Sequence, residues 1–246
     1  MKRIITLVLA ALMALSLFAC VSADEVTVMT YDEFVAAEVD TEVTVETYVQ
    51  AKQGWWTDSN SGVSQASFYT QSEEGGYFLY NLPCSEEEYE ALVPGTKIRV
   101  TGFKAEWSGE VEIIDATYEI IEDAEPYVAE AADVTELFGT DELVGKINQF
   151  VAVKGATVAA ANDAGAAYLY KWDGSGADGD DLYFNVTIGE ATYTFTVESY
   201  LCGAGTEVYE AVKALNVGDA IDLEGFLYWY EGPQPHITSV AAVVGE

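Results

Sequence analysis

The chain contains the same pattern twice, and this duplication limits what it can fold into. Three stretches of the first half each resemble a stretch of the second half. They are "YDEFVAAEVDTEVTVETYV" (31–49) with "TDELVGKINQFVAVKGATV" (140–158), "YFLYNLPC" (77–84) with "FTVESYLC" (195–202), and "EEYEALVPGTKIRVTGF" (87–103) with "EVYEAVKALNVGDAIDLEGF" (207–226). A self-match of this length indicates a duplicated domain rather than a stack of short repeats.

Glycines fix the register of the later part of the repeat. Gly95, Gly102 and Gly109 recur at one constant spacing as the set Gly218, Gly225 and Gly232. The two copies meet near "EDAEPYVAEAADV" (122–134), an acidic, alanine-rich stretch that contains Pro126. We therefore expect a first domain over 24–123, an acidic linker over 124–134 and a second domain over 135–246.

Each copy is predicted to consist mainly of strands. "EVTVETYVQA" (42–51), "TKIRVTGF" (96–103) and "EVEIIDATYEI" (110–120) alternate apolar and polar residues, as half-buried strands do. "SFYTQSEEGGYFLYN" (67–81) has two strand-like runs around a glycine-bearing turn, which predicts a hairpin.

Short helices punctuate these strands. Ser85 and Glu88 form a capping box, and the helix that follows is stopped by Pro94 and Gly95. The second copy has "TEVYEAVKAL" (206–215) at the same place. A further short helix precedes each copy, and Thr30 with Glu33 caps the first of these.

The order of elements in each copy predicts the fold. A strand, a two-stranded hairpin, a helix and a second hairpin follow one another, which is the order of the OB-fold, a five-stranded barrel. The alternative, a pair of β-sandwiches, requires about seven strands per domain and no helix at that position. We expect an all-β protein with short helices, built as two tandem OB-fold-like five-stranded barrels.

The N-terminus predicts export. Lys2 and Arg3 precede an apolar run, Ile4 to Phe18, which is shorter than the about 20 residues that span a membrane. We expect a signal peptide over 1–19. "LFAC" (17–20) predicts lipidation of Cys20, and hence an extracytoplasmic lipoprotein held at the cell surface by its lipid alone. Cleavage after "VSA" (21–23) with free secretion, or an uncleaved anchor, are the alternatives.

A resemblance supports both expectations. "VQAKQGWW" (49–56), "YFLYN" (77–81) and "CSEEEYEALVPGTKIRVTGFKAEWSGEVEIIDATYEI" (84–120) resemble segments of small exported OB-fold lipoproteins of clostridial and related gut bacteria. The resemblance covers residues 31–121 well and the second copy weakly. It implies the fold and the compartment, and it leaves the ligand open.

Tryptophan and tyrosine residues gather in the loops that flank the ligand-binding face of an OB-fold. OB-folds bind ligands on the face of strands 2 and 3, between the loops that join strands 1–2 and 4–5. In the first copy these loops are "KQGWWTDSNSG" (52–62) and "KAEWSGE" (104–110), and in the second copy the 4–5 loop is "LYWYEGPQPH" (227–236). The predicted ligand contacts are Trp55, Trp56, Trp107, Lys52 and Lys104, with Tyr228, Trp229 and Tyr230 as the second-copy equivalent. The alternative is that these rings fold back and close the barrel ends.

The charge narrows the ligand class. The chain has 42 acidic and 10 basic residues, two of the latter in the predicted signal, so its net charge is −32. A duplex binder neutralises about 6–10 phosphates with Lys or Arg, and a single-strand binder needs a positive groove. We therefore expect nucleic acid to be an unlikely partner, and a glycan or a protein to be the ligand.

Catalytic and metal signals are weak. "WDGSGADGDD" (172–181) offers a calcium candidate, Asp173, Asp178, Asp180 and Asp181, without the spacing of an EF-hand. His236 is the single histidine, expected at a strand surface or a core edge rather than as a general base, and no cofactor motif is present. Cys84 and Cys202 are expected to be separate thiols rather than a disulfide.

These observations predict an exported, lipid-anchored, non-catalytic binding module with no cofactor. Two other functions stay open at this point. One is an envelope scaffold without a small ligand. The other is a hydrolase that uses a pair of carboxylates in a cleft between the barrels.

Overall fold

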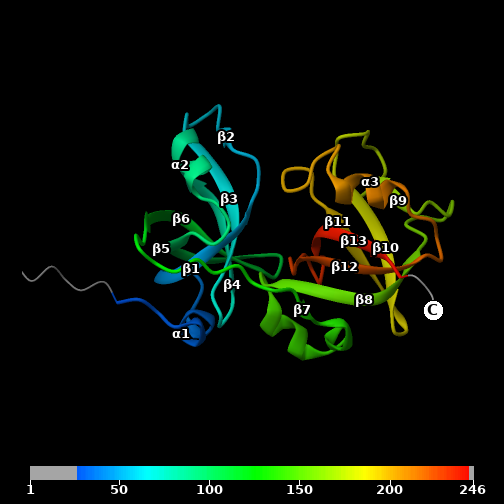
Figure 1. The fold of residues 1–246 in the computed structure, drawn as a ribbon, viewed down its shortest axis with the longest axis horizontal. Coiled ribbons are helices and arrows are strands. Elements are labelled where there is room, and N and C mark those ends of the chain that lie inside the picture. The colour runs from blue at the N-terminus through cyan, green and yellow to red at the C-terminus, as the bar shows by residue number, and fades with distance from the viewer. Residues whose placement is uncertain (1–26, 244–246) are drawn as a thin grey trace, which may run out of the picture.

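The computed structural model describes residues 27–243, which form two small barrels side by side (Figure 1). The predicted signal peptide and Cys20 lie outside the described residues, so export and lipidation stay predictions. Within residues 27–243, no helix is long and apolar enough to cross a membrane.

The first barrel closes through five strands in the order of an OB-fold. The strands are β1 (Glu42–Lys52), β3 (Ser64–Gln71), β4 (Gly76–Pro83), β5 (Lys97–Trp107) and β6 (Glu110–Ile120). β1 pairs with both β3 and β5, and the ring is completed by the pairs β3–β4, β5–β6 and the parallel pair β4–β6. Helix α2 (Glu86–Ala91) joins β4 to β5, and β2 (Trp56–Thr57) extends β3 at its edge.

The second barrel repeats this arrangement, as the duplication predicts. Its strands are β8 (Phe150–Ala159), β10 (Leu182–Ile188), β11 (Ala191–Val197), β12 (Ala220–Phe226) and β13 (His236–Ala242), with α3 (Glu207–Lys213) between β11 and β12. The pairs β8–β10, β10–β11, β12–β13, β12–β8 and the parallel pair β11–β13 close the ring. β7 (Ala132–Asp133) and β9 (Tyr168–Tyr170) lie beside β8 and β10. The prediction of tandem OB-fold-like barrels is confirmed.

The helices begin where the caps predict. Capping boxes of Thr30 with Glu33 and of Ser85 with Glu88 start α1 (Tyr31–Ala36) and α2. The lead-in to the second barrel consists of two 3-10 helices, η1 (Thr135–Leu137) and η2 (Asp141–Lys146). A 3-10 helix is typical of short connecting segments like this one.

The recurring glycines mark equivalent backbone positions in the two barrels. Gly95 and Gly218 have φ of 91° and 97°, and each donates its N–H, over 2.8 Å, to a carbonyl of the first strand of its barrel. Gly225 lies at an irregularity in the pairing of β12 with β13, and a Cβ added to it would approach the His236 carbonyl oxygen to 2.2 Å. The duplication therefore preserves places where only glycine fits.

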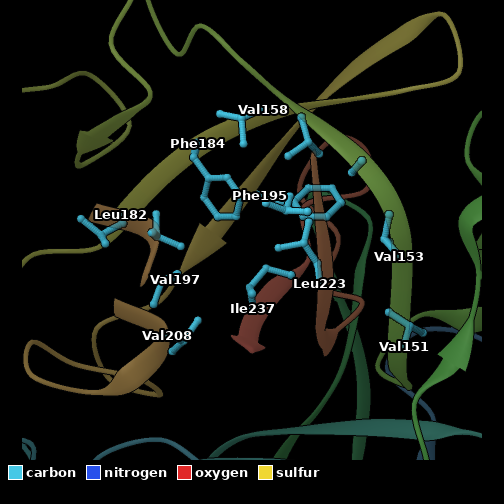
Figure 2. Packing of buried hydrophobic residues seen from close by; sticks show 14 of the residues in the cluster. Val151, Val153, Val158, Leu182, Phe184, Phe195, Val197, Val208, Leu223 and Ile237 are labelled. Carbon is cyan, nitrogen blue, oxygen red and sulfur yellow. The ribbon is translucent and has the colours of Figure 1, made fainter. Parts of the chain in front are cut away.

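Each barrel has its own apolar core. The second core is filled from all five strands and α3, and Figure 2 shows Phe184, Phe195 and Leu223 pointing into it together with valines of β8. The first core is likewise filled from all five strands, around Phe68 and Leu79, and Phe34 of α1 is buried in it. Side chains that alternate along a strand point to opposite faces, so the neighbours of these core residues point out of the barrels.

A third apolar cluster, which we call the joint, lies between the two barrels. Tyr69 and Phe78 point outward from β3 and β4 and pack with Phe226 of β12. The rings of Tyr69 and Phe226 stack with their centroids 4.4 Å apart, and the Tyr69 hydroxyl is 2.8 Å from Nδ1 of His236. We define the recognition face of each barrel as the outward side of its second and third strands. The second barrel therefore covers part of the recognition face of the first.

The segment predicted as a linker, 124–134, is attached to both barrels. The Ala129 N–H donates to Oε1 of Gln50 in β1 over 2.8 Å. Further along, β7 pairs in parallel with β8, and Val134 is buried in the second core. These contacts add to the apolar joint in fixing how the barrels sit against one another.

Candidate functional site

The recognition face of the second barrel is hollowed into a cavity of about 580 Å³, which we call the cleft. Tyr183 of β10 lies directly across from Thr196 of β11 on this face, while their neighbours Phe184 and Val197 fill the core. The connection between β9 and β10 and the connection between β12 and β13 flank the cleft. These connections hold the positions of the 1–2 and 4–5 loops at which OB-folds bind ligands.

Aromatic side chains from both barrels line the cleft: Trp107, Trp172, Tyr183, Tyr228 and Tyr230. Trp172 is 76% exposed and Trp107 is 54% exposed. Trp107 comes from the first barrel, and its ring centroid lies 5.1 Å from that of Tyr230. The two 4–5 turns also meet through their backbones, because the Glu231 N–H donates to the Ser108 carbonyl over 2.8 Å. The first barrel thus completes a site that belongs mainly to the second.

Polar groups lie between these rings. Asp181 Oδ1 accepts hydrogen bonds from the Ser199 N–H (2.8 Å) and hydroxyl (2.6 Å), which fix the carboxylate. Oε2 of Glu198 accepts from Nε2 of Gln53 of the first barrel over 2.9 Å. Burial, together with the charge of Asp181, raises the pKa of Glu198 to about 8. The hydroxyl of Thr196 is buried without a hydrogen-bond partner among the described residues.

His236 forms the floor of the cleft at the joint. Its ring stacks on Tyr228 with centroids 4.2 Å apart, and it is only 7% exposed. Burial lowers the pKa of His236 to about 3, so the imidazole is neutral at ordinary pH. His236 lies at a core edge, as expected from the sequence. Its contacts with Tyr228 and Tyr69 give the neutral ring a packing role.

A second cavity, of about 440 Å³, adjoins the cleft on the side of the first barrel, and we call it the side pocket. Trp56, Tyr80 and Tyr200 line it, and all three are exposed. It shares Glu198, Tyr228 and His236 with the cleft. Aromatic surface therefore continues from the cleft along the seam between the barrels.

The structure separates the predicted first-barrel contacts. Trp107 lines the cleft and Trp56 lines the side pocket. Trp55 packs against the first core instead, and its Nε1 donates to the Cys84 carbonyl over 3.0 Å. For Trp55, the alternative in which a loop ring folds back onto its barrel describes the structure.

The two predicted lysines contact backbone carbonyls away from the cavities. Nζ of Lys52 donates to the Tyr89 carbonyl over 2.6 Å and lies 3.9 Å from the centre of the Tyr89 ring. Nζ of Lys104 donates to three carbonyls at the end of α1, those of Phe34, Val35 and Ala37. A cation at a helix C-terminus satisfies carbonyls that have no partner within the helix. Neither lysine is among the described residues that line the cleft or the side pocket.

The three predicted contacts of the second copy, Tyr228, Trp229 and Tyr230, also lie in different places. Tyr228 and Tyr230 line the cleft. Trp229 turns toward the first barrel, and its backbone N–H donates to Oε2 of Glu110 over 2.7 Å. A Cβ added to Gly109 would approach the Trp229 ring to 2.6 Å, so this glycine allows the two 4–5 turns to meet.

The acidic loop does not assemble a metal site. Asp178 accepts from Lys213 over 2.9 Å, and one oxygen of Asp180 accepts from the Ala177 N–H. Within residues 27–243, no group of three or more metal-ligating side chains could hold an ion, and the calcium candidate Asp173, Asp178, Asp180 and Asp181 has no support beyond its composition. Cys84 and Cys202 are both free thiols, as predicted.

Fold and site together define a tandem OB-fold protein with an aromatic cleft. No family model and no curated protein matches the chain. Solved structures resemble it at low identity. A murine DNA-binding protein bound to double-stranded DNA is 11% identical, with 82% of this chain and 99% of that chain covered and a TM-score of 0.37. A replication protein A heterotrimer bound to single-stranded DNA is 12% identical, with 85% and 50% covered and a TM-score of 0.35. The tetrameric p202 HIN2 is 12% identical, with 84% and 96% covered and a TM-score of 0.34.

Two predictions are corrected at this point. The sequence led us to expect a glycan or protein ligand, with a scaffold or a hydrolase as alternatives, and to set nucleic acid aside as an unlikely partner. The solved structures that resemble this chain include complexes with double-stranded and single-stranded DNA. Net charge alone was an insufficient reason for the exclusion, because bases can be bound by stacking as well as through their phosphates.

Sequence reasoning missed much of the cleft. It did not select Trp172, Tyr183, Thr196 or Gln234, and it considered Asp181 only as a calcium ligand. A signal was available: Tyr183 and Thr196 occupy outward positions on the second and third strands of the second copy, and Trp172 precedes them in its 1–2 loop.

Proposed function

We propose that this protein is a non-catalytic binding protein that holds unstacked bases of single-stranded nucleic acid in the cleft. The observation that carries the proposal is the open recognition face of the second barrel. It lies between the two connections that OB-folds use for binding, and it presents exposed rings from both barrels.

Stacking is the interaction that the cleft offers most. Every base has a flat π-face, and stacking on an aromatic side chain is worth about 1–3 kcal/mol per base. Trp107 and Trp172 expose large ring surfaces to a ligand, and Tyr230 supports Trp107 from the side. A duplex keeps its bases stacked on one another, so the cleft favours a single strand.

The charges exclude the usual phosphate contacts. Among the described residues that line the cleft there is no lysine or arginine, and two lining residues, Asp181 and Glu198, are acidic. The net charge of −32 also repels a polyanion at long range. We infer that bases enter the cleft while the phosphates stay in solvent.

This mode of binding predicts an unusual response to salt. Ordinary nucleic-acid binders lose affinity as salt rises, because binding releases counterions. Here salt screens a repulsion, so affinity for a short single-stranded oligonucleotide should stay constant or increase between 50 and 500 mM salt, a range over which the Debye length shortens from about 14 Å to about 4 Å. Fluorescence anisotropy of a labelled tetranucleotide measures it.

An abasic strand of the same length and a matched duplex are the controls, and both should bind at least about tenfold more weakly than the single strand. Equal binding of the abasic strand, or affinity that falls steeply with salt, would show that the phosphates carry the interaction and that the proposal is wrong.

A further inference from the structure

We infer that the cleft selects bases whose edge presents two adjacent N–H donors, as the edge of guanine does. This inference rests on the proposed function and adds the identity of the base. It depends on the polar groups that lie between the aromatic rings.

Two carboxyl groups lie next to one another at the end of the recognition face. In the register of β10 and β11, Leu182 pairs with Val197, so the next residues outward along the two strands are Asp181 and Glu198. Both line the cleft. The hydrogen bonds from Ser199 go to Oδ1 of Asp181, and Oδ2 has no hydrogen-bond partner among the described residues. A fixed acceptor is thus left for a ligand.

A buried hydroxyl lies beside these acceptors. Thr196 precedes Glu198 by two residues on β11 and lies across from Tyr183, so it belongs to the same outward face. Its side chain lines the cleft, the residue is 1% exposed, and Oγ1 has no partner within residues 27–243. A buried hydroxyl without a partner is costly, and a ligand that bonds to it would remove that cost.

Acceptors beside a hydroxyl match the pairing edge of guanine. Guanine presents N1–H and the 2-amino group side by side, which suit the Asp181 carboxylate, and its O6 accepts from a hydroxyl, that of Thr196 or of the protonated Glu198. Hypoxanthine lacks the 2-amino group. Adenine places an unprotonated ring nitrogen toward the Asp181 carboxylate, and uracil has one N–H between two acceptors. A site built to hydrogen-bond a group rejects analogues that lack it, because its own polar atoms are then left unpaired.

Neutral nucleosides test the inference without the phosphate repulsion. Guanosine, inosine, adenosine and uridine are titrated into the full chain at pH 7, with tryptophan fluorescence as the readout. Guanosine should bind most tightly and inosine about tenfold or more weakly, since one hydrogen bond to a charged group is lost. Asp181→Asn should reduce the guanosine-to-inosine ratio to near one, and Thr196→Val should weaken both nucleosides.

Asp173→Asn is the matched control, because Asp173 is a carboxylate of the same loop that does not line the cleft; it should leave the ratio unchanged. Melting curves establish that each variant is folded, and Glu198→Gln serves as a second carboxyl variant if Asp181→Asn unfolds. If all four nucleosides bind equally, the inference about base identity fails and the proposed function stands. If neither nucleosides nor the tetranucleotide bind, the proposed function itself fails.

Discussion

Replacing Tyr69 by alanine is expected to release the two barrels from one another. Tyr69 is fully buried at the joint, where it stacks on Phe226 and shares a hydrogen bond with His236. Truncating a buried aromatic residue to alanine typically costs about 3–5 kcal/mol. Because the ring belongs to the joint and to neither barrel core, the loss falls on the contact between the barrels.

The expected result is a change in how the molecule unfolds. The wild-type chain should unfold in one cooperative transition, since Tyr69, Phe78 and Phe226 bury apolar surface between the barrels that would be exposed if either barrel unfolded alone. Tyr69→Ala should show two transitions in calorimetry, and X-ray scattering should give a larger radius of gyration. Tyr69→Phe keeps the stacked ring but leaves the buried Nδ1 of His236 without its partner, so it should cost about 1–3 kcal/mol, less than Tyr69→Ala. A single transition and an unchanged radius for Tyr69→Ala would show that the joint does not depend on this ring.

The stability of the protein is expected to fall as pH rises from about 5 to 9. The cause is the raised pKa of three carboxyl groups near the joint, those of Glu110, Glu112 and Glu198. Burial raises the pKa of Glu112 to about 7, and burial with the charge of Asp181 raises that of Glu198 to about 8. Burial raises the pKa of Glu110 well above its usual range, and Oε1 of Glu110 has no partner among the described residues.

The sign of the effect follows from which state binds more protons. An unfolded glutamic acid loses its proton near pH 4.5, whereas these folded groups keep theirs to higher pH. Between those values the folded state holds more protons, so the free energy of unfolding decreases as pH rises. One pKa unit corresponds to about 1.4 kcal/mol, so the raised pKa values of Glu112 and Glu198 set an upper limit of roughly 8 kcal/mol. We expect at least about 3 kcal/mol of this loss, because local relaxation lets water reach the ionised groups.

Other titratable groups at the joint do not reverse this trend. Burial raises the pKa of Tyr69 and Tyr228, which therefore stay protonated across the range, and His236 stays neutral. Glu46 behaves in the opposite way: hydrogen bonds from Lys97 and Arg99 lower its pKa, so its contribution is lost only in acid. Stability should therefore be greatest near pH 5.

Thermal unfolding across pH measures the prediction. At about 2–4 °C per kcal/mol for a chain of this size, the melting temperature should fall by roughly 6–12 °C between pH 5 and pH 9. Glu198→Gln and Glu112→Gln should each flatten the curve, because an amide keeps the shape of the carboxylic acid without ionising. A melting temperature that is constant or rises over this range would contradict the assignment of these groups.

The barrel topology was predictable because local signals and the duplication agreed. The capping boxes fixed where α1 and α2 begin, and the repeated glycines marked the same turns and crossings in both copies. These are constraints on the backbone, and a single sequence expresses them directly. For this reason the order of elements within each barrel was correct.

The joint was not predictable from the same signals. Tyr69 and Phe78 alternate with core residues on their strands, so their outward direction was implied. What covers an outward aromatic residue depends on the packing of two domains, which no local pattern encodes. The sequence therefore placed the main site on the first barrel, whereas the second barrel lies over part of that face and its own face is the one left open.

The contacts of Lys104 were also not predictable from the sequence. Lys104 begins the 4–5 loop that contains Trp107, and the sequence predicted it to be a ligand contact. In the folded chain its Nζ contacts the three carbonyls at the end of α1, and the residue is 8% exposed. The partner helix lies about seventy residues earlier in the chain, a separation over which sequence patterns carry no contact information.

The ligand is expected to bind in the cleft of the second barrel, which Trp107 completes. The affinity of a fluorescein-labelled single-stranded tetranucleotide for three alanine variants, measured by anisotropy, tests this expectation. Trp107→Ala and Trp172→Ala should each weaken binding by about tenfold or more, the loss of one stacked base, while Trp56→Ala should bind as the wild-type chain does. Loss of binding in Trp56→Ala with no change in the other two variants would contradict this expectation.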